Sequence, residues 1–310
     1  MMRLLVTGAT GFLGRHVLAS PSFAGCTLLR ATRSTTASSD TEVPLGPGPW
    51  SRGDFARAIE AARPDVILHL AGATGAMGAR TCFDANAILA AELLAAAAAL
   101  PRAPGIVLVG SAAEYGFVEQ SAQPVREDHP CAPVTDYGIA KYAQTLLGLR
   151  ASAQGGRVLV ARLFNPVGEG MPSHLALSSF ARQLALPTGS APVLRVGNLD
   201  VRRDFLDVRE AARLLAALAL RPTWPWPLVN LCSGRAYRLQ DLLNNLITAS
   251  GLAARIEVDP SLLRPGEMPE LAGDTTRLRQ VGLLPETPDF GQLLPKLLAE
   301  ARRQAGLGHG

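Results

Sequence analysis

Three side chains in the first half of the chain could together move a proton. Tyr137 and Lys141 are four residues apart in the sequence Tyr-Gly-Ile-Ala-Lys, so a helix would place them on one face. A phenol ordinarily ionises near pH ~10, and a fixed ammonium beside it makes ionisation easier. Ser111 ends an apolar run and would add a hydroxyl at the end of a strand. This combination predicts acid–base chemistry by Tyr137 at neutral pH.

Lys141 is also unusual by composition. Of the 30 basic residues only Lys141 and Lys296 are lysines, which leaves 28 arginines. A compact ammonium can lie close beside a phenol, whereas the wider guanidinium fork fits such a place poorly. We therefore expect a specific role for Lys141 and a solvated surface position for Lys296.

A glycine-rich loop opens the chain. Thr7–Gly14 reads TGATGFLG, after an apolar run and before a helical pattern, which is the context that a dinucleotide-binding loop requires. Gly8 permits the tight turn, Gly11 lets backbone approach a pyrophosphate, and Gly14 permits close packing of helix and strand. The alternative is a structural turn. The loop predicts a dinucleotide whose pyrophosphate lies at the helix N-terminus.

The residues after the second predicted strand bear on the choice of dinucleotide. Arg33 stands where an NAD-binding protein would place an acidic residue, and a guanidinium suits the 2′-phosphate of NADP. The alternative for Arg33 is a solvated loop residue. We expect NADP(H) to be preferred, with NAD(H) possible.

Short apolar runs alternate with helical patterns, and these elements must position the groups above. We predict an α/β fold, a Rossmann-type doubly wound parallel sheet with a smaller C-terminal α/β substrate domain. Strands are predicted at Arg3–Thr7, Cys26–Thr32, Val66–Leu70, Ile106–Gly110, Val158–Phe164 and Leu228–Leu231. Helices are predicted at Phe12–Ala19, Phe55–Ala62, Phe83–Leu100, Tyr137–Ala153 and Asp207–Leu220, with Asp54 as an N-cap.

Two regions rich in proline, glycine and polar residues read as irregular, Thr35–Arg52 and Asn165–Pro192. We predict an NADP-binding Rossmann domain from residues 1–164 plus about 203–237. The substrate domain would then comprise about 165–202 plus 238–310.

Composition narrows the class of protein. With 48% hydrophobic and 18% charged residues, the chain has ample material for a core. Its net charge of +4 is scattered rather than in runs, so we expect an anionic small ligand and no nucleic acid. Four cysteines without metal-ligand spacing predict free thiols, no metal site and a cytoplasmic location. Without a signal peptide or ~18 uninterrupted apolar residues, no membrane association is expected.

The order of these motifs resembles the extended short-chain dehydrogenase/reductases, the family of sugar-nucleotide epimerases, dehydratases and reductases. The likeness covers almost the whole chain. It is carried by TGATGFLG at Thr7–Gly14, PDVILHLAG at Pro64–Gly72, Asn86, GSAAEYG at Gly110–Gly116, YGIAK at Tyr137–Lys141, RLFNPVG at Arg162–Gly168, RRDFLDV at Arg202–Val208 and RPGE at Arg264–Glu267.

The resemblance implies roles for individual residues. Ser111 would hydrogen-bond the reacting sugar oxygen, Tyr137 would exchange its proton, and Lys141 would bind the nicotinamide ribose and lower the pKa of the tyrosine. A nucleotide-sugar would meet Asn165, with Arg203 and Arg264 near its diphosphate. The implied cofactor contacts are Gly8, Thr10, Gly11, Phe12, Leu13, Gly14, Arg33, Leu70, Ala71, Gly72, Asn86, Tyr137, Lys141 and Phe164.

Three further expectations accompany the resemblance. Asn86 has a role facing the cofactor or in a helix kink, or else is an ordinary helix residue. His69 is expected to be a core histidine rather than a catalyst. The helix Phe83–Leu100 and the helix of Tyr137 resemble the pair that forms a dimer interface in this family, so a homodimer is expected.

The window after Ser111 separates the family's reactions. The family's 4,6-dehydratases carry an acid and a base where this chain has Ala112 and Ala113. Glu114 is one position further on, and strand alternation should turn it away. A bulge that rotates this segment would weaken that exclusion. We therefore expect hydride transfer alone: reduction of the C4 ketone of an NDP-4-keto-6-deoxyhexose, with a pattern closest to the GDP-4-keto-6-deoxymannose reductases. The alternatives are an NDP-hexose 4-epimerase and a non-catalytic NADP-sensing regulator.

Overall fold

A seven-stranded parallel sheet forms the centre of the larger part of the molecule. The computed structural model describes residues 1–73, 78–186, 192–263 and 266–306. The strand order is β10-β6-β5-β4-β1-β2-β3, and it reverses between β1 and β4. The strands are β1 (Arg3–Thr7), β2 (Thr27–Thr32), β3 (Glu42–Pro44), β4 (Val66–His69), β5 (Gly105–Ser111), β6 (Val158–Leu163) and β10 (Leu228–Leu231).

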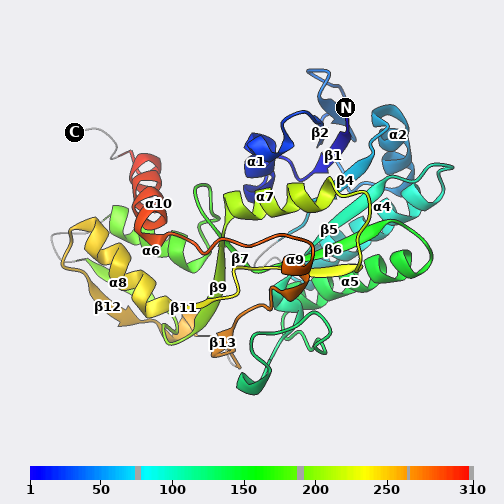
Figure 1. Cartoon of the computed structure of the whole chain (residues 1–310). Helices are drawn as coiled ribbons and strands as arrows, with labels where there is room; N and C mark the ends of the chain where they lie inside the picture. The colour runs from blue at the N-terminus through cyan, green and yellow to red at the C-terminus, as the bar shows by residue number, and fades with distance from the viewer. Residues whose placement is uncertain (74–77, 187–191, 264–265, 307–310) are drawn as a thin grey trace.

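Helices cover both faces of this sheet (Figure 1). One face packs on α1 (Phe12–Ala19) and α7 (Val208–Ala219). The other packs on α2 (Arg52–Ala62), α4 (Leu89–Ala98) and α5 (Asp136–Ala153). Alternate residues of one strand belong to the two cores, because successive side chains point to opposite faces; in β1, Leu4 joins the first core and Leu5 the second. This explains why the strands read as unbroken apolar runs. The predicted doubly wound sheet is confirmed.

A second group of elements lies beside the carboxyl ends of the main sheet. A small sheet pairs β7 (Asn165–Val167), β9 (Arg202–Asp207), β11 (Ala236–Arg238) and β13 (Glu270–Leu271), and another pairs β8 (Val193–Val196) with β12 (Arg255–Val258). Their own core contains α6 (Ala176–Ala185), α8 (Leu239–Ser250) and α10 (Phe290–Gln304). Shorter elements are α3 (Ala79–Cys82), α9 (Thr276–Gln280), a π-helix η2 (Phe83–Ile88), and the 3-10 turns η1 (Pro21–Phe23), η3 (Ala112–Glu114), η4 (Gln120–Ala122) and η5 (Pro260–Leu262).

The predicted domain boundary near residue 203 falls at the start of β9. This strand pairs with β7, β11 and β13, while α7 and β10, which follow it, join the main sheet. The two-domain division of the chain stays a prediction.

The structure corrects some of the element predictions. The N-cap of α2 is Ser51 rather than Asp54, because Ser51 and Asp54 form a reciprocal capping box that begins the helix at Arg52. The region expected to be irregular around residue 43 contains β3, and the later one contains β7 and α6. β3 and β7 are three residues each, too short to show a periodicity in the sequence.

The predicted helix Phe83–Leu100 is an interrupted one. Residues Ala79–Ala98 form α3, η2 and α4 in succession. By length and composition this is, among the described residues, the one helical stretch that could cross a membrane, and 44% of its most apolar window is buried. Leu93, Ala96 and Ala97 pack into the core over the main sheet. A buried core helix passes the same test, and the absence of a membrane partner stays a prediction.

Candidate active site

The glycine loop crosses the end of the main sheet where the strand order reverses. Gly8 has a left-handed φ of 69°, and a Cβ there would lie 2.6 Å from the Ala71 nitrogen. The Gly11 N–H donates to the Gly8 carbonyl at 3.0 Å, and α1 begins at the next residue. The loop is therefore pressed against the end of β4. A cradle that a single Cβ would fill fits the close backbone approach of a dinucleotide pyrophosphate.

The other loop residues lie at the surface of this cradle. Thr10 and Gly11 are exposed, and Phe12 and Leu13 are half-buried at the start of α1. A Cβ at Gly14 would overlap the Gly8 carbonyl oxygen, which explains the need for glycine where helix and loop meet.

The segment after β4 is tied to β1 by hydrogen bonds. The hydroxyl oxygen of Thr7 accepts the N–H of Ala71 at 3.2 Å and lies 2.9 Å from Nδ1 of His69. His69 is 1% exposed, and its Nε2 has no partner within the described part of the protein. Burial, together with the charge of Lys141, lowers the pKa of His69 to about 3, so its ring is neutral. Its place in the core agrees with the expected core histidine.

Helix α5 carries Tyr137 and Lys141 to the end of β5. Thr135 caps the helix by accepting the Gly138 N–H at 3.0 Å. A Cβ at Gly138 would lie 2.6 Å from the Ala113 carbonyl oxygen, so the helix touches the turn that follows Ser111. Burial raises the pKa of Tyr137, and hydrogen bonding to Ser111 opposes that rise. The structure thus brings Ser111 and Tyr137 together, with a phenol that is protonated at neutral pH.

The ammonium of Lys141 is buried on the inner face of α5. It donates to the Val109 carbonyl at 2.9 Å and to Oε1 of Gln144 at 3.1 Å, and the residue is 6% exposed. Burial lowers the pKa of Lys141 to about 8. The expected lowering of the Tyr137 pKa by Lys141 stays a prediction.

Asn86 lies in the π-helical turn η2, against the same space. Its Nδ2 donates to the carbonyls of Cys82 at 2.9 Å and Ala73 at 3.2 Å, and its buried Oδ1 has no partner in the described regions. A Cβ at Gly72 would lie 2.5 Å from that Oδ1 and 3.4 Å from Nζ of Lys141. Gly72, Asn86 and Lys141 therefore converge, and the orphaned oxygen fits a bound hydroxyl donor. The widened helix at Asn86 agrees with a kink role.

Two predicted cofactor residues differ in their exposure. Arg33 follows β2, is exposed, and forms no side-chain hydrogen bond or ion pair within the described residues. It is open to a ligand. The ring of Phe164 is 1% exposed and packs near Tyr115, so only its backbone could reach a cofactor.

The predicted substrate residues are in and around the small sheet. Asn165, in β7, donates to the Asp204 carbonyl at 2.8 Å. Arg203, in β9, pairs with Glu267 at 3.5 Å and donates to the Arg202 carbonyl at 2.9 Å. Arg264 lies outside the described residues.

Comparison with known proteins now bears on the site. A sequence model of the NAD dependent epimerase/dehydratase family matches residues 4–224. The chain belongs to this family.

Relatives of this epimerase/dehydratase family member modify sugar nucleotides. GDP-6-deoxy-D-mannose reductase of Pseudomonas aeruginosa is 31% identical, covering 92% of this chain and 92% of its own. The dTDP-6-deoxy-L-talose 4-dehydrogenase (NAD(P)(+)) of Kitasatospora kifunensis is 30% identical, with 97% and 94% covered. The UDP-glucose 4-epimerase of Azospirillum brasilense is 28% identical, with 92% and 87% covered.

A solved structure extends the likeness to the fold. That of RMD from Pseudomonas aeruginosa complexed with NADPH superposes with a TM-score of 0.79 at 27% identity, covering 98% of each chain. The fold and the resemblance predicted from the sequence are confirmed. The similar proteins are reductases, dehydrogenases and epimerases of NDP-sugars, which supports an activity that modifies an NDP-sugar.

The window after Ser111 in this family member folds differently from the prediction. β5 ends at Ser111, and Ala112–Glu114 form the turn η3, so the argument from strand alternation was wrong. Glu114 is nevertheless 0% exposed, and its carboxylate pairs with buried Arg162. The positions of a dehydratase acid and base remain alanines.

Two residues of this family member were missed by the sequence reasoning. Gln144 shares the Val109 carbonyl with Lys141, and its position three residues after Lys141 on a helix was a usable signal. Arg162 is a charged residue inside the otherwise apolar strand β6, which also marks it. Among the described residues all four cysteines are free, and no three metal-binding side chains cluster.

Proposed function

We propose that the protein reduces the C4 ketone of an NDP-4-keto-6-deoxyhexose with NADPH, in deoxysugar biosynthesis. The observation that carries the proposal is a site with Ser111, Tyr137 and Lys141 in place but with alanines at 112 and 113. Such a site can move a hydride and one proton, and lacks the acid and base for eliminating water. The likeness to GDP-6-deoxy-D-mannose reductase supports reduction.

NADPH is the proposed cofactor, with NADH as a poorer substitute. Exposed Arg33 after β2 supplies a guanidinium for a 2′-phosphate, with no competing partner within the described regions. The pyrophosphate would lie against Gly8–Gly11 and the ribose against Asn86 and Lys141. When bound, the nicotinamide supplies the hydride.

Side chains of the protein then bind and protonate the carbonyl oxygen of the ketone that is being reduced. Ser111 Oγ donates a hydrogen bond to the ketone and keeps the substrate in place. Tyr137, whose pKa burial raises further above neutral pH, gives its proton to the same oxygen as negative charge develops there. The protonated Lys141 offers positive charge near the tyrosinate that remains. Asn165, Arg203 and Arg264 would meet the sugar nucleotide, with the arginines at its diphosphate.

A second candidate is an NDP-hexose 4-epimerase, which would oxidise and re-reduce the same carbon. It is favoured by the family and by the Azospirillum brasilense relative. Net consumption of NADPH separates the two, because an epimerase returns its hydride within each turnover.

We also propose that the protein is a cytoplasmic homodimer. Ile139 and Leu146 are 41% and 48% exposed and seven residues apart on the outer face of α5, while Lys141 and Gly148 face inward. Ile88 of the adjoining η2 is 52% exposed. This apolar face supports contact with a second copy of the chain.

The replacement Tyr137→Phe tests the catalytic role. It removes one hydroxyl, so we expect NADPH oxidation with 4-keto-6-deoxy nucleotide-sugars to fall at least about a hundredfold, as loss of a general acid does. Tyr142→Phe, five residues along α5, is the matched control and should stay near wild type. Near-wild-type turnover by the Tyr137 variant would remove this residue from the mechanism.

A further inference from the structure

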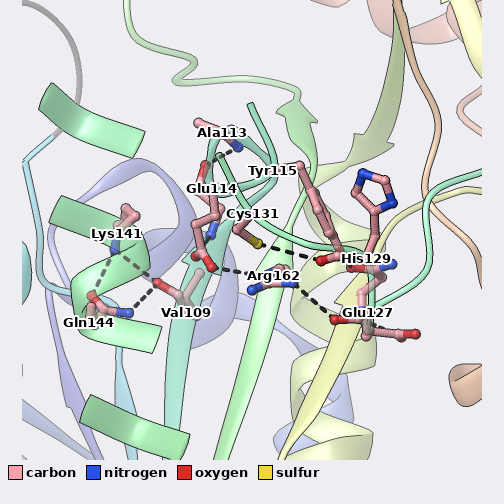
Figure 2. A network of polar contacts seen from close by, with 12 residues as sticks. Val109, Ala113, Glu114, Tyr115, Glu127, His129, Cys131, Lys141, Gln144 and Arg162 are labelled. Atoms are coloured by element: carbon pink, nitrogen blue, oxygen red, sulfur yellow. Dashed lines mark hydrogen bonds and ion pairs between the residues drawn. The ribbon is translucent and has the colours of Figure 1, made fainter. Parts of the chain in front are cut away.

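A buried ion pair lies next to Ser111. Nε of Arg162 is 2.7 Å from Oε2 of Glu114, and the two side chains are 2% and 0% exposed. Figure 2 shows the guanidinium lying between Glu114 and Glu127. Taking two charges out of water is costly, so apolar side chains would fill this volume with less penalty. The groups that Glu114 contacts suggest what the pair does.

Glu114 holds Ser111 in place through a backbone hydrogen bond. Its Oε1 accepts the Ser111 N–H at 2.7 Å, and Oγ of Ser111 accepts the Ala113 N–H at 3.2 Å. The two bonds form a capping box around the turn η3, which fixes both the backbone and the hydroxyl oxygen of Ser111. A Cβ at Gly110 would come 2.5 Å from Glu114 Oε1, so the strand leaves room for the carboxylate only because glycine is there.

Arg162 is itself held on several sides. Its guanidinium carbon lies 4.6 Å from the centre of the Tyr115 ring, and Nη1 donates to the Glu127 carbonyl at 3.4 Å. The Tyr115 hydroxyl donates to Oδ1 of buried Asn230 at 2.6 Å. The arginine therefore has little freedom, and neither has the carboxylate bonded to it.

The charge of Glu114 also affects the pKa values of Lys141 and Tyr137. Burial raises the pKa of Glu114, but two donors, Arg162 Nε–H and Ser111 N–H, favour the ionised carboxylate. That charge opposes the lowering of the Lys141 pKa by burial and adds to the raised pKa of Tyr137. Other polar or ionisable groups around these residues are His69 from β4, Cys82 beside η2, Gln144 and Thr145 on α5, and Cys131 near Arg162.

We propose that Glu114, held in place by Arg162, is a positioning residue for the reaction. It fixes the Ser111 hydroxyl where the reacting oxygen must bind, and it supplies the buried negative charge that balances the Lys141 ammonium. The first part rests on the proposed reduction, whereas the second can be measured without a substrate.

The replacement Glu114→Gln separates charge from shape. An amide oxygen can still accept the Ser111 N–H, but the negative charge is lost. Because a neutral amide at this position would leave Arg162 as an unpaired buried charge, the double variant E114Q/R162M serves as a second test that removes both charges. Glu210→Gln is the matched control, since Glu210 is also buried and paired with an arginine, Arg213 at 2.6 Å, but lies on α7.

Kinetics test the part that concerns Ser111. We expect kcat to fall about ten- to a hundredfold in E114Q and in the double variant, with KM for the nucleotide-sugar and NADPH affinity within about twofold of wild type. Glu114→Asp should be slow as well, because its shorter side chain cannot keep both bonds. Folded variants with wild-type kcat, or with altered KM and unchanged kcat, would overturn the positioning role.

The two lysines make the electrostatic part directly observable. With lysine labelled in 13C and 15N, only Lys141 and Lys296 give side-chain NMR signals, and Lys296→Arg assigns them. We expect the Lys141 titration to move to lower pH in E114Q and to stay unchanged in Glu210→Gln, with Lys296 as an internal reference. An unmoved Lys141 titration overturns this part. A shifted titration in a protein that reduces no 4-keto sugar would contradict the proposed function and leave the electrostatic role of Glu114 standing.

Discussion

Burial shifts the pKa values of three side chains at the end of the sheet. His69 is neutral, Tyr137 is a protonated acid, and Lys141, with a pKa of about 8, carries its charge at neutral pH. Lys141 is the more informative of the chain's two lysines, because its ammonium has two protein partners and still lies near Gly72 and Asn86.

Burial of His69 makes the folded state less stable at acidic pH. The folded pKa is about 3 against an ordinary 6.5, so the unfolded chain takes up a proton below pH 6.5 while the folded chain does not. Stability is therefore full above pH 6.5 and is lost as the pH falls from 6.5 towards 3. Between pH 7 and 5 this residue should remove about 2 kcal/mol from the free energy of unfolding.

Chemical denaturation at the two pH values measures that loss. In His69→Gln the loss should be smaller by about the same 2 kcal/mol, while exposed His174→Gln provides a comparison on the surface. Equal pH dependence in wild type and His69→Gln would mean that the buried ring titrates normally.

Arg33 should decide between the two nicotinamide nucleotides. A charge-assisted, forked contact with phosphate contributes about 1.5–3 kcal/mol, so Arg33→Ser should weaken NADPH binding about ten- to a hundredfold and leave NADH binding nearly unchanged. Arg30→Ser is the control, because Arg30 is already paired with Glu42 at 3.0 Å. Equal weakening of both nucleotides, measured by fluorescence titration, would contradict the assignment.

At the scale of elements, the sequence predicted the main strands well, because strands buried on both faces leave an unmistakable apolar run. It predicted β10 at its observed bounds and α1 likewise. It could not predict the π-helical turn at Asn86, which depends on side-chain hydrogen bonds to Cys82 and Ala73.

The site was predictable where a motif has local spacing, and hidden where it depends on tertiary contact. Tyr137 and Lys141 share a helix face, so four residues of spacing were enough. Glu114 and Arg162 are 48 positions apart, and only the pairing of β5 with β6 brings them together. The turn that redirects Glu114 likewise depends on its bonds to Ser111, not on an alternating pattern.

The outer face of α5 should control assembly. In a two-fold interface one substitution acts twice, so Leu146→Glu would bring two charges into an apolar contact and should release monomers. Light scattering after size exclusion should give wild type twice the 32.6 kDa chain mass, and the variant one. Val258→Glu, at an apolar residue on β12 that is 57% exposed, should remain dimeric. A monomeric wild type, or dissociation by both variants, would contradict the proposed interface.

On the scale of the whole molecule, the two sheets carry different groups of the candidate site. The main sheet supplies the glycine loop and the acid–base residues, and the small sheet holds Asn165 and Arg203. A hydride donor on one side and a nucleotide-sugar on the other would meet over Ser111 and Tyr137.

The central claim is net hydride transfer to a 4-keto sugar, and isotope tracing tests it most directly. NADPH deuterated at C4 of the nicotinamide would be incubated with GDP-, dTDP-, UDP- and CDP-4-keto-6-deoxyhexoses, followed by NMR of the products. We predict stoichiometric oxidation of NADPH with at least one of these sugars and deuterium at C4 of the alcohol formed. Interconversion of NDP-hexose C4 epimers without net NADPH oxidation, or no reduction of any of the four, would contradict the account.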